Sequence, residues 1–309
     1  MHKDLLCAVL VILGHAQERI DGMIRLVAVD MDGTLLGPDG RVSDRNAHVI
    51  RCMQDMGVEL LICTGRSYED ALLPLEEAGL KAPVVCMNGA STYDSLGRRL
   101  GKVGLATTQV ERIVESCKDE GIIFDFMTDK GSCTIALEEE FKDYFNRNVL
   151  LPMAEFSYES VRSRFTFLPP GELFRRGLEF YKVSVIHESP LVLGKLRERL
   201  GLVPDLAIAS SAATNLELTH QDAQKGKALA GYAAMRNIGW NEIMAVGDSE
   251  NDYSMLSMDL KYTVAMGNAM ERIKKTAKCQ TRTNSQDGVA YAIENLVFEG
   301  RSCRNLGSI

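Results

Sequence analysis

Short apolar runs that stop abruptly at a polar side chain are the feature that most constrains how this chain can fold. The runs cover residues 26–29, 58–63, 83–87 and 242–246 and are rich in β-branched residues. Such runs are typical of parallel strands that are buried on both faces. Because segments with helical spacing lie between them, the sequence predicts an α/β fold with a Rossmann-like, doubly wound parallel sheet.

Capping signals place helices between these strands. Ser43 precedes apolar positions that recur at three-residue steps, and Gly57 follows the last of them, so a helix is expected to start and stop there. Ser67 begins a second helical pattern, with Asp70 as a capping-box-like partner and Pro74 as an expected kink. Later in the chain the patterns predict helices at 225–235, from 253 and at 287–297, and a strand at 262–266.

The middle of the chain departs from this alternation. With 309 residues the chain exceeds the usual size of one domain, so a body with an inserted module is expected. Helical patterns at 107–120, 138–146 and 191–200 alternate with strand patterns at 122–127, 133–137 and 180–186, and strands near 205–209 and 214–219 would complete the insert's sheet. We predict a core of 23–103 and 205–298, an α+β insert over 104–204, and a tail at 299–309.

Net charge and cysteine spacing limit the partners and the redox state that are expected of this chain. The formal net charge is −7, which would repel a phosphate backbone, so a nucleic-acid partner is not expected. The eight cysteines are scattered, without a C-x-x-C pair or a Cys/His cluster at zinc-ligand spacing. We interpret them as reduced thiols of a cytoplasmic protein, which acts as a monomer or a homodimer.

The N-terminus carries a ten-residue apolar run at 5–14. It is too short to span a bilayer, and no membrane partner is expected. Three interpretations stay open for residues 1–22: an extra helix, a weak secretion signal, or sequence upstream of a true start at Met23.

The motif Asp30-Met31-Asp32-Gly33-Thr34 follows the first predicted strand and carries two carboxylates. One aspartate can attack phosphorus while the other handles the proton of the leaving group. A calcium-binding EF-hand loop also begins D-x-D-G, but it needs a glutamate at its twelfth position, where this chain has Arg41. The preceding strand is also wrong for a helix-loop-helix, so the EF-hand interpretation is rejected.

Three further motifs supply groups suited to phosphate and metal. Thr64-Gly65-Arg66 offers a hydroxyl and backbone N–H groups at the end of a strand, and Lys225-Gly226 opens a helix with an ammonium. Residues 247–252, Gly-Asp-Ser-Glu-Asn-Asp, follow another apolar strand, and their carboxylates suit Mg²⁺. Each motif is weak alone, but all lie at strand ends or at the return from the insert, where α/β sheets place ligands.

Taken in order, these motifs make the chain resemble the haloacid dehalogenase superfamily, and specifically its Cof-type phosphatases with a C2 (type IIB) cap. The resemblance spans about residues 24–298. It is also carried by Asn88-Gly89-Ala90, by Leu216-Glu217-Leu218 leading to Lys225-Gly226, and by Ala265-Met266-Gly267-Asn268-Ala269.

The resemblance implies a role for each matching residue. Asp30 would be the nucleophile, and Asp32 the general acid and then the base that activates water. Mg²⁺ would lie among the Asp30 carboxylate, the Asp32 backbone carbonyl and Asp248, with Asp252 supporting it. The implied phosphate and substrate contacts are Thr64, Gly65, Arg66, Asn88, Lys225 and Asn251.

The expected activity is Mg²⁺-dependent hydrolysis of a small phosphorylated metabolite, such as a sugar phosphate, through an aspartyl-phosphate. The alternatives are a sugar phosphomutase of the same superfamily and a non-catalytic regulator that binds a phosphometabolite. Residues 220–224, before Lys225, depart from the family by lacking its glycine-containing turn. In the insert, Arg162 and Arg164 are interpreted as solvated.

Overall fold

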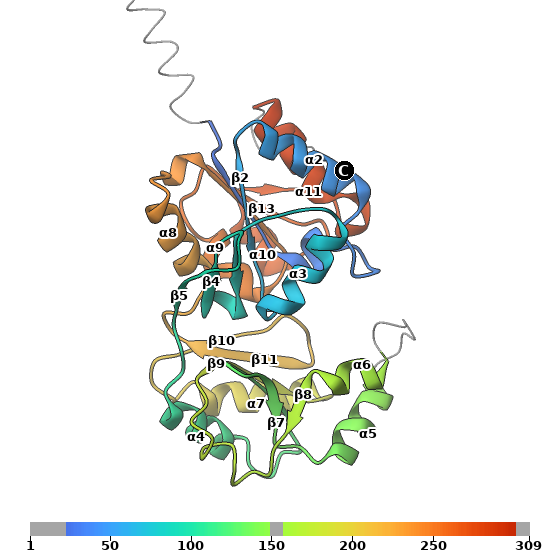
Figure 1. The fold of residues 1–309 in the computed structure, drawn as a ribbon, viewed down its shortest axis with the longest axis vertical. Coiled ribbons are helices and arrows are strands. Elements are labelled where there is room, and N and C mark those ends of the chain that lie inside the picture. Colours follow the sequence, from blue (N-terminus) through green and yellow to red (C-terminus); the bar gives the residue numbers. More distant parts are fainter. Residues whose placement is uncertain (1–22, 149–156, 301–309) are drawn as a thin grey trace, which may run out of the picture.

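The computed structural model describes residues 23–148 and 157–300, which build two domains, each around its own sheet (Figure 1). The apolar run at 5–14 and the tail beyond residue 300 lie outside the described residues. Within the described residues, no helix is both long and apolar enough to cross a membrane.

The first domain is built on an eight-stranded sheet in the order β14-β13-β12-β1-β2-β3-β4-β5. Its first six strands are parallel: β1 (Leu26–Val29), β2 (Glu59–Cys63), β3 (Val84–Cys86), β12 (Ile243–Gly247), β13 (Tyr262–Ala265) and β14 (Cys279–Gln280). Every residue of β1 is buried, because β12 and β2 flank it and helices cover both faces. This explains why its sequence is uniformly apolar and does not alternate.

The helices of this core domain are α2 (Asp44–Asp55), α3 (Tyr68–Glu77), α8 (Lys225–Met235), α9 (Tyr253–Leu256), α10 (Glu271–Thr276) and α11 (Gly288–Ile293), which continues as a π-helical turn over Glu294–Phe298. The side chain of Ser43 accepts a hydrogen bond from the backbone N–H of Asn46, and that of Ser67 accepts one from Asp70. Both predicted N-caps are therefore confirmed. A hairpin of β4 (Ser91–Tyr93) and β5 (Arg99–Lys102) adds two antiparallel strands that the sequence patterns did not predict.

The second domain, which we call the cap, has a six-stranded sheet in the order β10-β11-β9-β6-β7-β8. Its strands are β6 (Ile123–Thr128), β7 (Gly131–Thr134), β8 (Phe165–Phe167), β9 (Phe180–Ile186), β10 (Leu206–Ala209) and β11 (Asn215–His220), and its helices are α4 (Thr107–Ser116), α5 (Glu138–Asn148), α6 (Tyr158–Ser163) and α7 (Pro190–Leu200). As expected, the strands after residue 204 complete this sheet. A boundary at 204 therefore divides one sheet, and we place the end of the cap after His220.

The cap sheet has one apolar and one polar face. Phe126, Val183 and Leu218 belong to a buried cluster that also contains residues of α4 and α7. Those helices lie on the side of the cap sheet away from the core (Figure 1). Asp125, Lys182, Ser184 and Glu217 take the alternate positions along the strands, and Lys182 and Glu217 reach the core.

Ion pairs join the cap to the core. Arg164 binds Asp70 on α3 at 3.2 Å, and Arg197 on α7 binds Glu250 at 2.7 Å. Arg162 pairs with Glu138 within the cap at 2.7 Å. Both arginine side chains are nearly half exposed, at 45% and 47%, and neither lines the cavity described below, so their interpretation as solvated holds, with a surface carboxylate partner for each.

The expectation that all cysteines are reduced is wrong at Cys279, which is disulfide-bonded. Free thiols are present at Cys52, Cys63, Cys86, Cys117 and Cys133. Burial raises the pKa of the Cys117 and Cys133 thiols to about 12, so both act as small apolar groups.

Asp125 in β6 is a buried carboxylate whose Oδ1 atom has no hydrogen-bond partner among the described residues. Burial raises its pKa from the ordinary 3.8 to about 6, although a hydrogen bond from Ser132 opposes the shift. Between these two pH values the unfolded chain releases the proton while the folded protein keeps it. The buried charge therefore lowers the free energy of unfolding progressively as the pH rises from 3.8 to about 6, and the loss stays constant above that.

Asp125→Asn should consequently stabilise the protein at neutral pH. The expected gain is about 1–3 kcal/mol in the free energy of unfolding at pH 7.5, measured by urea denaturation, because the amide carries no charge to desolvate. Asp119→Asn, at an exposed cap position, is the control and should change little. A gain of equal size at pH 4.5 would contradict the assignment, since Asp125 is mostly protonated there.

Candidate active site

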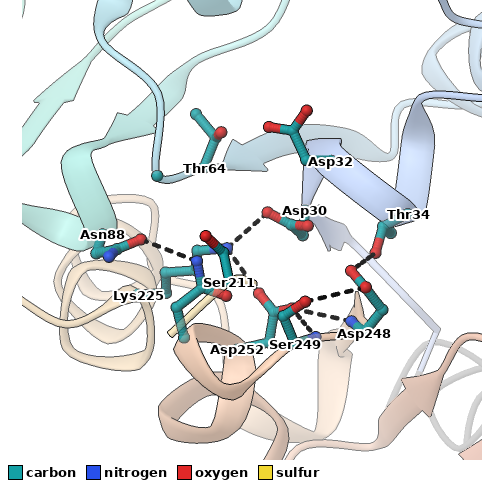
Figure 2. Close-up of polar contacts among 12 residues, drawn as sticks. Asp30, Asp32, Thr34, Thr64, Asn88, Ser211, Lys225, Asp248, Ser249 and Asp252 are labelled. Atoms are coloured by element: carbon teal, nitrogen blue, oxygen red, sulfur yellow. Dashed lines mark hydrogen bonds and ion pairs between the residues drawn. The ribbon is translucent and has the colours of Figure 1, made fainter. Parts of the chain in front are cut away.

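Four predicted site residues lie directly after four neighbouring core strands. Asp30 follows β1, Thr64 follows β2, Asn88 lies just beyond β3, and Asp248 follows β12. The carboxyl ends of parallel strands meet at one edge of a sheet, so the fold brings together residues far apart in sequence. Figure 2 shows these side chains converging with Lys225, which begins α8.

Lys225 is the centre of this group. Its Nζ lies 2.6 Å from Asp30 Oδ1 and 2.7 Å from Asp252 Oδ1, and its side chain is fully buried. Burial alone would lower the pKa of Lys225, but the Asp252 and Asp30 carboxylates outweigh burial and raise it. The lysine is therefore a permanent cation beneath the expected nucleophile.

At Asp30, by contrast, burial outweighs the effect of the oppositely charged neighbour on the pKa. Burial and the neighbouring carboxylates of Asp252 and Asp248 raise its pKa well above the ordinary value, although Lys225 acts against the shift. The side chain also borders a cavity of about 410 Å³. A buried carboxylate that is held through one oxygen and borders a cavity is suited to nucleophilic attack.

Asp252 uses both of its carboxylate oxygens within the protein. Oδ1 accepts from Lys225, and Oδ2 accepts from the backbone N–H groups of Asp248 at 2.9 Å and Ser249 at 3.0 Å (Figure 2). Asp252 therefore orients the lysine and shapes the loop that carries Asp248. This arrangement fits a supporting role better than direct ligation of a metal.

Asp248 is held by two hydroxyl groups. Thr34 Oγ1 donates to Oδ1 at 2.9 Å, and Ser249 Oγ donates to Oδ2 at 3.0 Å. Burial, followed by the charge of Asp252, raises the pKa of Asp248 to about 6. The ligand atoms of Asp30, Asp248 and Asp252 lie within 4.8 Å of one another. Three close carboxylates beside one ammonium leave an excess of negative charge, which fits a hard divalent cation.

Gly33 allows the first loop to approach Asp248. Its φ is +75°, and an added Cβ would lie 2.5 Å from Asp248 Oδ2. Gly33→Ala should therefore displace a predicted metal ligand and lower kcat/KM by about 10²-fold. Gly40→Ala is a matched control, because Gly40 has φ +78° and no atom within 4 Å of an added Cβ. Both variants should lose similar stability through backbone strain, and equal activity in phosphatase assays would contradict the packing argument.

Asp32 and Arg66 form an ion pair at the edge of the cavity. Arg66 Nε and Nη2 donate to the two carboxylate oxygens of Asp32 at 2.8 Å and 2.6 Å. The Asp32 side chain is 58% exposed, so this carboxylate is far more accessible than that of Asp30. The sequence motifs did not predict this pairing between two expected site residues.

Thr64 and Asn88 are held by neighbours of their own. Thr64 is fully buried, and its Oγ1 accepts from the backbone N–H of Arg66 at 3.1 Å. Asn88 Nδ2 donates to Glu217 at 2.8 Å, and its Oδ1 accepts from Asn251 Nδ2 at 3.2 Å. Asn88 and Asn251 are therefore fixed by the cap as well as by the core.

Glu217 and Lys182 are residues to which sequence reasoning assigned no role. Lys182 Nζ on β9 donates to Glu217 on β11 at 3.1 Å and to the backbone carbonyl of Gly65 at 2.6 Å. Both side chains are almost fully buried, and Asn88 and Lys182 together lower the pKa of Glu217 against the effect of burial. The sequence does carry a signal for them, because each is a charged residue inside an otherwise apolar strand. Side chains alternate between the two faces of a strand, so these residues lie on the face opposite the cap's apolar cluster.

The parallel sheet carries carboxylates and a buried lysine at its carboxyl edge, and an α+β cap covers that edge. This arrangement is that of a capped phosphoryl-transfer hydrolase. Residues 27–293 match the family described as haloacid dehalogenase-like hydrolases. The chain belongs to this family and is a phosphatase of the phosphoric monoester hydrolase class.

The relatives agree over nearly the whole length of the chain. Phosphatase YwpJ of Bacillus subtilis is 33% identical, covering 89% of this chain and 100% of the relative. An HMP-PP phosphatase of Serratia proteamaculans is 28% identical, covering 82% and 87%. A haloacid dehalogenase-like hydrolase structure from B. subtilis has a TM-score of 0.78 at 31% identity, covering 88% and 100%. The subclass IIB sugar phosphatase BT4131 shares the fold, with a TM-score of 0.72 at 21% identity, covering 87% and 98%.

Proposed function

We propose that this phosphatase hydrolyses the phosphomonoester of a small metabolite through an aspartyl-phosphate on Asp30, with Mg²⁺ as its cofactor. The observation that carries the proposal is the position of Asp30, which borders the cavity while Lys225 holds one of its oxygens at 2.6 Å. The neighbouring acidic cluster and the phosphatase relatives support the same chemistry.

The reaction has two displacement steps. An Asp30 oxygen attacks phosphorus, the bond from phosphorus to the leaving oxygen breaks, and Asp32 gives its proton to that oxygen. Asp32 then takes a proton from water, whose oxygen attacks phosphorus and breaks the bond to Asp30. Lys225, Thr64 and the backbone at Gly65 are the proposed contacts of the phosphoryl oxygens.

Arg66 has a defined place in this scheme. A general acid must be free to reach the leaving oxygen, whereas Arg66 contacts both carboxylate oxygens of Asp32 in this structure. We infer that substrate phosphate draws Arg66 away from Asp32, so that the same residue binds substrate and releases the acid. Asn88 and Asn251, which share Glu217 as a partner, complete the proposed substrate contacts.

The acidic cluster fits Mg²⁺ through its oxygen ligands. The Asp30 carboxylate, the Asp32 backbone carbonyl and Asp248 would hold the ion, and Asp252 would support them through its contacts to Lys225 and to the loop. When bound, Mg²⁺ would neutralise charge and let an anionic carboxylate approach an anionic phosphate.

The test is phosphate release from a panel of phosphomonoesters that includes p-nitrophenyl phosphate. We expect turnover in Mg²⁺, loss of at least about 90% of it in excess EDTA, and recovery when Mg²⁺ is added back. Absence of release from every panel member would overturn the hydrolase proposal. Release that EDTA does not change would overturn the metal requirement alone.

A further inference from the structure

The loop that carries Asp248 and Asp252 also contains a third carboxylate, Glu250. We call residues 248–252 the acidic loop, and Glu250 begins its 3₁₀ turn, Glu250–Asp252. Glu250 is not part of the cluster of carboxylates whose ligand atoms lie within 4.8 Å of one another. It is also not among the described residues that line the cavity at Asp30. The acidic loop therefore turns one carboxylate away from the site, and that carboxylate is available for another task.

Glu250 is bound by the cap. Arg197 on α7 donates from Nη1 to Glu250 Oε1 at 3.0 Å and from Nη2 to Oε2 at 2.7 Å, so the pair is bidentate. The Arg197 side chain is 37% exposed and that of Glu250 is 20% exposed. A bidentate arginine–carboxylate pair fixes the relative orientation of the two planar groups as well as their distance. Helix α7 and the acidic loop are therefore held in one geometry.

Arg197 reaches the core past the edge of the cap sheet. β10 is the edge strand of that sheet, and its Ile208 carbonyl accepts from Arg197 Nη2 at 3.2 Å. Helix α7 itself lies on the side of the sheet away from the core (Figure 1). A cavity of about 250 Å³ lies between β10 and the core, with Ala207 and Ala209 on the cap side and Tyr253 on the core side. Direct packing is therefore incomplete at this edge, and the ion pair bridges the two domains beside the cavity.

The core holds the acidic loop from the other side. Arg272 Nη1 on α10 lies 3.5 Å from Glu250 Oε1, and its guanidinium carbon lies 4.5 Å from the centre of the Tyr253 ring. The backbone N–H of Met270, just before α10, donates to the carbonyl of Asp248 at 3.0 Å. The acidic loop thus lies between cap helix α7 and core helix α10. A displacement of the cap would be transmitted to it through Glu250.

The other ion pairs between cap and core, among the described residues, end away from the acidic loop. Arg164 binds Asp70 on α3, and Glu179 binds Lys102 on β5. Arg197 is therefore the cap cation that contacts the loop carrying the expected metal ligands.

We propose that Arg197 is a positioning residue that couples the docking of the cap to the binding of Mg²⁺ at the acidic loop. The inference rests on the proposed function, which supplies the Mg²⁺ that Asp248 would hold. With the cap docked, Arg197 holds Glu250, and through it the loop, in the geometry that the ion needs. Because coupling between two binding events is reciprocal, bound Mg²⁺ in turn favours the docked cap by the same factor.

Charge and position predict opposite effects of removing Arg197. The arginine adds a positive charge to the surroundings of the loop, so a purely electrostatic role would make Arg197→Met bind Mg²⁺ more tightly. A positioning role makes the same variant bind Mg²⁺ more weakly, because the ion must then order the loop as it binds. The sign of the change in Mg²⁺ affinity therefore distinguishes the two roles.

The test measures the Kd of the full chain for Mg²⁺ by isothermal titration calorimetry, without substrate. We expect Kd to rise at least about fivefold in Arg197→Met. Arg197→Lys should fall between wild type and Arg197→Met, because lysine keeps the charge but cannot make the bidentate contact.

Arg164→Met is the matched control for this measurement. It removes a cap–core ion pair of similar exposure that does not touch the acidic loop, so its Kd for Mg²⁺ should equal that of the wild type. The proposal is overturned if Arg197→Met has an unchanged or lower Kd. It is also overturned if Arg164→Met raises the Kd as much as Arg197→Met does, because loosening the cap anywhere would then be sufficient.

Amide hydrogen exchange measures the reciprocal effect. In the wild type, Mg²⁺ should slow exchange in peptides that cover α7 and β10, although these elements are not expected to contact the ion. In Arg197→Met this slowing should be lost. Slowing of equal size in both proteins would mean that the ion does not act on the cap through Arg197, and would overturn the proposal.

The inference and the proposed function fail in distinguishable ways. If the wild type binds Mg²⁺ and releases phosphate while Arg197→Met has the same Kd, only the coupling is wrong. If the wild type binds no Mg²⁺, the cofactor assignment is wrong and the coupling falls with it. If Mg²⁺ binds but no phosphomonoester is hydrolysed, the hydrolase proposal is wrong, and the comparison of Kd values still decides the coupling.

Discussion

Asp30→Asn is expected to lower kcat/KM for every phosphomonoester by roughly 10³-fold or more, because the amide cannot form the aspartyl-phosphate. The fold should survive this change. Asn has nearly the same shape, Lys225 keeps its contact with Asp252, and one of three crowded carboxylates is removed. The loss should therefore appear in activity and not in the urea unfolding midpoint.

The measurement combines steady-state phosphate release with an acid-quenched reaction on radiolabelled p-nitrophenyl phosphate. Wild type should carry a label that hydroxylamine removes, as expected of an acyl phosphate, and Asp30→Asn should carry none. Asp222→Asn is the control, because Asp222 is an exposed aspartate paired with Lys227 on the surface. If Asp30→Asn were as active as wild type, Asp30 would not be the nucleophile.

The convergence of the candidate site residues was predictable from sequence because it depends on strand ends. Largely apolar runs located β1, β2 and β12, and the polar residues that follow these runs had to lie at one edge of the sheet. Helix starts were equally local, since Ser43 and Ser67 cap the turns that follow them. These predictions required only neighbouring residues and the general geometry of parallel sheets.

Contacts between residues far apart in the sequence were not predictable in the same way. The pairing of Arg66 with Asp32, and of Glu217 with Asn88, joins residues 34 and 129 positions apart. No local pattern specifies such partners, because the first pair depends on how two loops of the core come together and the second on how the cap meets the core. The β4–β5 hairpin was missed for a different reason: β5 is fully exposed at the sheet edge, so its sequence has no apolar run.

Lys225→Met is expected to have the largest effect on stability. It replaces a fully buried ammonium that contacts two buried carboxylates at 2.6 and 2.7 Å. Removing one member of such a group leaves the others as uncompensated buried charges, which costs about 3–5 kcal/mol. Activity should fall by at least about 10²-fold, because the charge proposed to stabilise the transferring phosphoryl group is lost. Lys227→Met, two residues along α8 at an exposed ion pair, should change the free energy of unfolding by less than about 1 kcal/mol.

Adding Asp252→Asn to Lys225→Met separates charge imbalance from lost packing. If unpaired carboxylates cause the instability, neutralising one of them should return part of the lost free energy, so the double variant should unfold at a higher urea concentration than Lys225→Met alone. Asp252→Asn by itself should instead destabilise, because Asp252 holds Lys225 and two backbone N–H groups. If Asp252→Asn destabilises the wild type but stabilises Lys225→Met, the lysine is the counter-charge of this site. Additive losses would mean that its methylene packing matters more than its charge.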